Sequence, residues 1–150
     1  MFFHLHKSLL SKVFVCLTLS VFLLSVSSCS EEGQVISKPD EVTHVFQSSE
    51  RILLKAIAQV MTDKGFGRGV IDYGNNVVES DYTVQDEWRT KAIARVRKIS
   101  RRETEATLTV ITEKKTGTGW ELRRLLGSQQ YETLFAAIET QIYRELYKVD

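Results

Sequence analysis

The stretch from Trp88 to Glu113 reads WRTKAIARVRKISRRETEATLTVITE and decides the fold. Apolar and polar side chains alternate along both halves of it, which is the pattern of strands with one buried face. In the first half one face holds Trp88, Ala92, Ala94 and Val96, and the other holds Arg89, Lys91, Arg95 and Arg97. In the second half Ala106, Leu108 and Val110 lie opposite Glu105, Thr107, Thr109 and Glu113. The sequence therefore predicts strands over residues 88–99 and 104–113.

A turn near residues 100–102 would join these two strands into an antiparallel hairpin. The pairing would bring Arg97 opposite Glu105 and Arg89 opposite Glu113. Each such ion pair contributes only about 0.2 to 1 kcal/mol. The register is nevertheless well specified, because a slip of one residue would expose the whole apolar face.

The segments on either side predict two helices and a second hairpin. Apolar residues at three- and four-residue steps predict a helix over residues 46–64. Two β-prone runs, 70–73 and 77–84, are separated by Gly74-Asn75-Asn76, which suits a tight turn. After a loop at 116–119 and a short segment at 120–126, another apolar stripe predicts a helix from Ser128 to the end. The expected fold is α+β: a helix, a four-stranded antiparallel sheet and a C-terminal helix, with both helices on one sheet face.

The first 28 residues have the composition of an export signal. Lys7 and Lys12 precede an apolar run of 12 residues from Val13 to Leu24, and this segment contains no acidic residue. A membrane-spanning helix needs about 20 apolar residues. The run is therefore shorter than a permanent anchor and suits a cleaved signal.

The residues Val26-Ser27-Ser28-Cys29 resemble the lipobox of bacterial lipoproteins. The resemblance implies that the thiol of Cys29 accepts a diacylglycerol, that a signal peptidase cuts just before it, and that its new amino group is acylated. By the sorting pattern of enterobacterial lipoproteins, Ser30 would direct the protein to the outer rather than the inner membrane. An ordinary signal with an incidental cysteine and a short uncleaved anchor are the alternatives.

A tether is expected between the lipid and the domain. Residues 30–40 are polar, show no hydrophobic period, and include Gly33 and the only proline, Pro39. We expect a lipidated cysteine and flexible tether over residues 29–45, with a reach of about 50 Å when extended, and a single domain over residues 46–150.

Few residues after Cys29 suggest chemistry. His44, the only histidine after Cys29, falls in the expected tether, so we predict no metal and no cofactor. Glu79 and Asp81 would share a strand face, as paired catalytic carboxylates could, but any exposed strand gives this spacing. The glycines of 116–119 lack the Gly-Lys-Ser ending of a phosphate loop. We therefore expect no enzymatic activity.

The uneven distribution of charge along the chain is the most informative feature of its composition. Between Arg89 and Arg124 there are eleven basic and four acidic residues, an excess of +7, although the whole chain carries only +1. We hypothesise that the stripe Arg89, Lys91, Arg95 and Arg97 meets an anionic partner, with a solvated surface as the alternative. Nucleic acid is not expected as a partner of an exported protein.

In element order the chain is also similar to the helix-grip domains of the lipoprotein subunit of the β-barrel assembly machinery. The resemblance implies a structural or interaction module in a cell-envelope complex, held to the membrane through Cys29. The alternative is a periplasmic binding module for an anionic lipid or glycan.

Overall fold

A computed structural model describes residues 33–148. The predicted signal, the lipobox and Cys29 lie outside the described residues. The elements follow the order β1 (Gln34–Val35), β2 (Glu41–Phe46), α2 (Glu50–Asp63), β3 (Gly69–Asp72), β4 (Val77–Ser80), β5 (Thr83–Gln85), β6 (Trp88–Lys98), β7 (Thr104–Thr116), β8 (Gly119–Arg124) and α3 (Ser128–Leu146).

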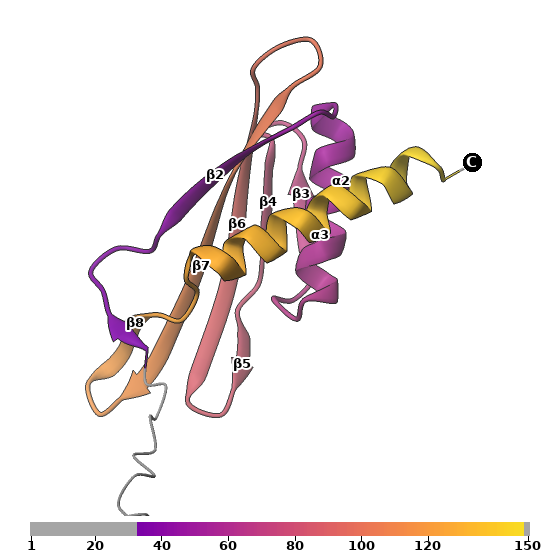
Figure 1. Ribbon diagram of the computed structural model, residues 1–150. Helices are drawn as coiled ribbons and strands as arrows, with labels where there is room; N and C mark the ends of the chain where they lie inside the picture. Colours follow the sequence, from indigo (N-terminus) through magenta and orange to yellow (C-terminus); the bar gives the residue numbers. More distant parts are fainter. Residues whose placement is uncertain (1–32, 149–150) are drawn as a thin grey trace, which may run out of the picture. The chain divides into compact units, whose positions relative to one another are not determined.

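The β6–β7 hairpin forms the centre of the sheet (Figure 1). The two strands pair antiparallel over the whole length of β6, from Trp88 opposite Lys114 to Lys98 opposite Thr104. The predicted opposition of Arg97 to Glu105 and of Arg89 to Glu113 is confirmed.

The other edges of β6 and β7 are each shared by two shorter strands. Along β7, β2 pairs with residues 104–109 and β8 with residues 112–116. Along β6, β5 pairs with residues 88–90 and β4 with residues 93–95. β1 extends the sheet beyond β8, and β3 extends it beyond β4. Every pairing is antiparallel, which gives one sheet of eight strands.

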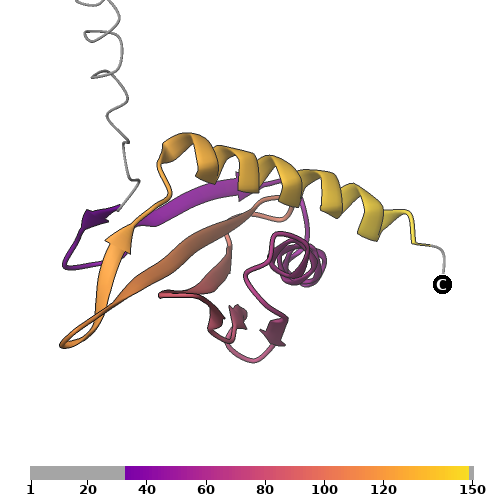
Figure 2. The ribbon, with the colours of Figure 1, turned by 90° about the horizontal axis from the view of Figure 1, so that it is seen from below.

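One face of the hairpin forms the core with the two helices. The buried residues of β6 and β7 are Ala92, Ala94, Val96, Ala106, Leu108 and Val110, with Thr104, Thr109 and Thr112. The apolar ones belong to the same cluster as Leu53, Leu54 and Ile57 of α2 and Leu134, Phe135 and Ile138 of α3. Figure 2 shows α2 lying between α3 and the β3–β4 edge of the sheet. The alternation in the sequence thus assigned the buried face correctly.

The expected fold class is wrong. The sheet has eight strands instead of four, and strand residues outnumber helical ones, so the protein is mainly β with two helices. The four additional strands are β1, β2, β5 and β8. Each is short, with at most six residues, and periodicity over so few residues is a weak signal.

The expected tether is also wrong for its described part. Residues 34–35 and 41–46 form β1 and β2, so these residues belong to the sheet of the domain and not to a tether. β2 lies at an edge of the sheet, where Val42 and Phe46 pack in or against the core and His44, on the same face, stacks on Phe135. Its pairing with β7 could not be inferred from composition.

The loop expected at residues 116–119 is a tight hairpin turn. Thr116 pairs with Gly119 across it, and the expected irregular segment after it is the strand β8. Gly119 has φ +137°, a conformation that favours glycine. By contrast, the predicted hairpin of β3 and β4 is confirmed, and its turn residue Asn76 has φ +53°.

We expect the two faces of β6 to respond differently to substitution. Val96→Asp would bury an unpaired charge at a site that is 6% exposed and should cost several kcal/mol, whereas the exposed Arg95→Gln should change stability by less than about 0.5 kcal/mol. Urea unfolding of both variants measures the difference. Equal losses would mean that the sheet faces are assigned wrongly.

Candidate functional site

The predicted basic stripe lies on the sheet face opposite the helices, and three of its four cations have carboxylate partners. The Arg89 Nε lies 2.6 Å from the Glu113 Oε2, and the Arg97 Nη2 lies 2.8 Å from the Glu105 Oε1. Lys91 forms an ion pair with Glu79 on β4. Most of the stripe therefore consists of cross-strand pairs, which offset its charge.

Ion pairs with carboxylates from other segments also offset the excess of +7 that was counted between Arg89 and Arg124. Arg124 makes two hydrogen bonds to Asp40, of 2.6 and 2.8 Å, and these lower the pKa of the Asp40 carboxyl. Asp40 and Glu79 both lie outside the range in which the excess of +7 was counted. A count along the chain missed them because the sheet brings distant segments together.

Arg89 lies between two aromatic rings. Its guanidinium carbon is 4.5 Å from the ring centre of Tyr82 and 4.4 Å from that of Trp120. The hydrogen bond from Arg89 lowers the pKa of Glu113, while burial and the neighbouring Glu113 raise the pKa of Tyr82. Stacking of this kind stabilises a cation by about 0.5 to 2 kcal/mol. Arg89 therefore joins the segments around β5, β7 and β8, a role that sequence reasoning missed because it took residues 77–84 as one strand and did not predict β8.

A group of cations without an ion-pair partner in the described part of the chain lies on β6 and in the turn between β6 and β7. Among residues 33–148, no carboxylate lies within ion-pair distance of Arg95, Lys98, Arg101 or Arg102, and all four are exposed. We call Lys98 to Arg102 the hairpin tip. It projects beyond both helices in Figure 1, and its Ile99 is 47% exposed. Within the stripe, Arg89, Lys91 and Arg97 are paired, so the exposed cations of this part of the hairpin that have no ion pair among the described residues are Arg95 and those of the tip.

An open hollow of about 590 Å³ lies on the same sheet face, over β3, β4 and β6. Three apolar residues, Val70, Val77 and Ile93, contribute to its lining. The polar and charged lining residues are Asp72, Asn75, Glu79, Ser80, Asp81, Lys91 and Arg95. Small-molecule pockets are mostly apolar with a few polar groups, so this lining is unlike that of a lipid-binding cavity.

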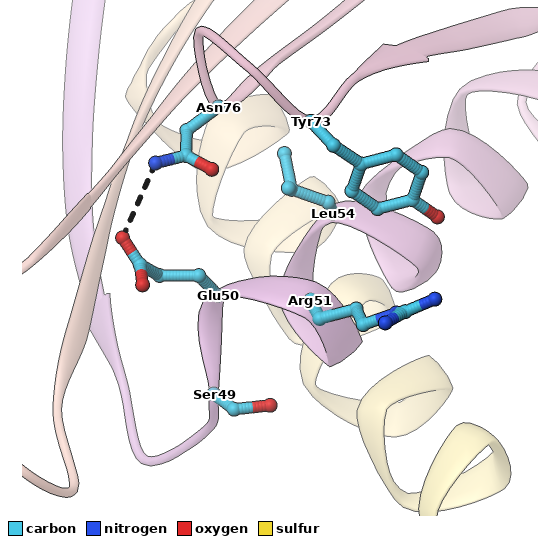
Figure 3. A pocket seen from close by; sticks show the side chains of 6 residues that line it. All are labelled: Ser49, Glu50, Arg51, Leu54, Tyr73 and Asn76. Carbon is cyan, nitrogen blue, oxygen red and sulfur yellow. Dashed lines mark hydrogen bonds between the residues drawn. The ribbon is translucent and has the colours of Figure 1, made fainter.

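A second cleft, of about 520 Å³, lies at the start of α2 (Figure 3). Glu50, in the first helical turn, accepts a hydrogen bond of 3.3 Å from Asn76, and Arg51 lies 5.6 Å from the ring centre of Tyr73. The helix N-terminus favours an anion, and the carboxylate of Glu50 already supplies one. The polar groups of this cleft are therefore engaged with each other.

The remaining candidates from the sequence have structural roles. His44 stacks on Phe135 with ring centres 5.0 Å apart, and Glu79 pairs with Lys91 and not with a second carboxylate. Within residues 33–148 no group of three His, Cys, Asp or Glu side chains could hold a metal ion. No helix in this part of the chain is long and apolar enough to cross a membrane.

Comparison with known proteins adds no family assignment. No protein-family model matches the chain, and no curated protein matches it significantly.

We expect Glu113 to stabilise the fold in a pH-dependent way. Its folded pKa is lowered, mainly by Arg89, so its contribution is full above the pKa of the unfolded carboxyl and is lost as the pH falls through the lowered value. Glu113→Gln should therefore be less stable than the wild type at pH 7, and the difference should shrink below about pH 4. Thermal melting at several pH values measures it. Glu139→Gln on α3 is the control, and a deficit at Glu113 that persists unchanged in acid would contradict the assignment.

Proposed function

We propose that this protein is a non-enzymatic lipoprotein, anchored through Cys29, that acts as an interaction module in a complex of the bacterial cell envelope. The lipobox at residues 26–29 is the observation that carries the proposal, because it accounts for the only cysteine that would remain after processing. The proposed location is the outer membrane, because Ser30 follows Cys29 as in the sorting pattern of enterobacterial lipoproteins that are sent there. Such a module acts by binding, and the unpaired cations of the hairpin tip are its proposed contact for an acidic partner protein.

Three features of the tip support this role. Its cations have no ion-pair partner within residues 33–148, so a partner's carboxylates would not have to displace existing ones. Ile99 supplies exposed apolar area beside them. Complementary charge also speeds and orients association. Arg95 of the predicted stripe continues this surface down β6, whereas Arg89, Lys91 and Arg97 are held in ion pairs.

The alternative is a binding module for an anionic lipid or glycan, with the hollow beside Arg95 as its site. Seven of the ten residues that line that hollow are polar or charged, which favours the interaction module, because a lipid needs an apolar cavity. A small anionic glycan would be detected by chemical-shift changes confined to residues around Arg95.

Replacing Cys29 with Ser should abolish fatty-acid labelling and cleavage before residue 29, because the serine hydroxyl does not take the place of the thiol as lipid acceptor. Labelling and the mass of the processed chain measure the outcome. Lipid incorporation that continues in this variant would overturn the lipobox interpretation.

Neutralising the tip should weaken the partner interaction without unfolding the domain. We expect the triple variant Lys98→Gln, Arg101→Gln, Arg102→Gln to recover less of the envelope partner from native membranes. The control variant Lys64→Gln, Arg68→Gln, Lys115→Gln removes the same charge from other exposed sites. Exposed charges contribute at most about 1 kcal/mol each to folding, so both variants should melt close to the wild type.

The same interaction should weaken as salt rises, since the Debye length is about 8 Å at 0.15 M. Equal partner recovery by the two triple variants would show that the tip is only a solvated surface.

A further inference from the structure

The ordered domain begins close to the proposed lipid. Only three residues lie between Cys29 and Gly33, so the Cα atoms of these two residues can be at most about 14 Å apart, whatever the conformation of the link. The headgroup layer on each side of a bilayer is about 5 to 8 Å thick. A lipid on Cys29 would thus hold Gly33 at or near the headgroups.

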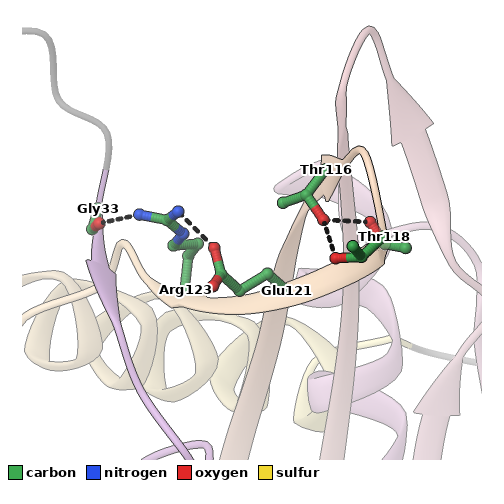
Figure 4. A network of polar contacts seen from close by, with 6 residues as sticks. Gly33, Thr116, Thr118, Glu121 and Arg123 are labelled. Carbon is green, nitrogen blue, oxygen red and sulfur yellow. Dashed lines mark hydrogen bonds and ion pairs between the residues drawn. The ribbon is translucent and has the colours of Figure 1, made fainter.

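Gly33 is fixed to the sheet. Its carbonyl oxygen accepts a hydrogen bond of 3.2 Å from the Arg123 Nη1, and Arg123 is itself paired with Glu121 (Figure 4). β1 continues from this point in register with β8, where Val35 lies opposite Arg123. Because Gly33 is held by β8, any limit on its position is a limit on the position of this corner of the sheet.

The same corner exposes two large apolar side chains. Val35 is 51% exposed and Leu125 is 42% exposed. The Leu125 Cδ2 lies only 2.5 Å from where a Cβ on Gly33 would be, so Leu125 covers Gly33. Val35 lies directly opposite Arg123 and shares its sheet face, and the Arg123 Cβ is 3.5 Å from the same point beside Gly33. Two exposed apolar side chains therefore lie beside the residue that the link holds near the membrane.

We propose that this corner, formed by β1 and the end of β8, is a membrane-contact surface that rests on the phospholipid surface holding Cys29, with Val35 and Leu125 in the headgroup layer. The inference rests on the lipidation in the proposed function and adds the orientation of the domain. Burial of the two side chains in the interface would stabilise the contact by about 25 cal/mol per Å² of apolar area removed from water.

The contact places the hairpin tip away from the bilayer. Val35 lies opposite Arg123 of β8, and Arg123 lies opposite Thr112 of β7. From Thr112 the strand β7 runs eight residue steps to Thr104, which lies beside the tip. At about 3.3 Å per residue this is roughly 26 Å. Figure 1 shows β1 and the β6–β7 turn at opposite ends of the sheet. A partner could then reach the tip while the β1 corner stays on the membrane.

The test uses the mature lipoprotein, purified from membranes and reconstituted into vesicles of phosphatidylethanolamine and phosphatidylglycerol. Once Cys29 carries lipid, the processed chain has no free thiol, so Val35→Cys and Leu125→Cys can each be labelled with an environment-sensitive fluorophore. Ile99→Cys is the matched control, because its residue is similarly exposed at the tip. Labels at 35 and 125 should shift to shorter wavelength and be quenched several-fold more by spin-labelled lipids than the label at 99.

Melting curves establish that each labelled variant is folded. If the substitution at residue 35 disturbs β1, the label at residue 125, which lies outside β1, still reports on the corner. Mass measurement before reconstitution reports lipidation separately. An unlipidated chain would contradict the proposed function, whereas a lipidated chain whose labels at 35 and 125 remain as solvent-exposed as that at 99 would overturn the membrane-contact surface alone.

Discussion

The pairing of β6 with β7 is the constraint on which the rest of the structure depends. Eleven consecutive pairs hold the two strands together, and their alternation separates an apolar face from a charged one. A displacement by one residue would bury arginine side chains under the helices and expose Ala94 and Val96. The same hairpin supplies the edges on which β2, β4, β5 and β8 assemble, so both the core and the outer face follow from one register.

The sheet divides the charged face into two parts that differ in how their cations are paired. Toward the β5–β6 end, Arg89 is held by Glu113 and two aromatic rings, so its charge is used within the domain. Toward the β6–β7 turn, Lys98 and its neighbours extend past the strands that could supply carboxylates, and their charge is directed to solvent. A partner of opposite charge would bind more readily at the β6–β7 turn. Binding at Arg89 would first require its half-buried ion pair with Glu113 to be broken, which costs free energy.

Only three residues link Cys29 to Gly33, so a lipid on Cys29 would fix which end of the sheet lies near the membrane. A long tether would let the domain take any orientation, and neither end of the sheet would be distinguished. With β1 in the sheet and Gly33 bound by Arg123, a lipid on Cys29 would instead constrain one corner. The exposed residues Val35 and Leu125 lie there, whereas the unpaired cations lie at the opposite end. Anchoring and partner binding would then use separate surfaces of one small domain.

The sequence by itself determined the central hairpin, its register and its buried face, because each depends on alternation over ten or more residues and on local turn chemistry. It also located the β3–β4 turn and both helices. Only the tertiary structure decided that residues 34–35 and 41–46 are strands, since a short edge strand is stabilised by the neighbour it pairs with and too few residues alternate to indicate it. The partners of Arg89, Lys91 and Arg124 were likewise decided by the fold: Tyr82, Glu79 and Asp40 approach them only when separate segments pair in the sheet, and no spacing along the chain encodes that approach.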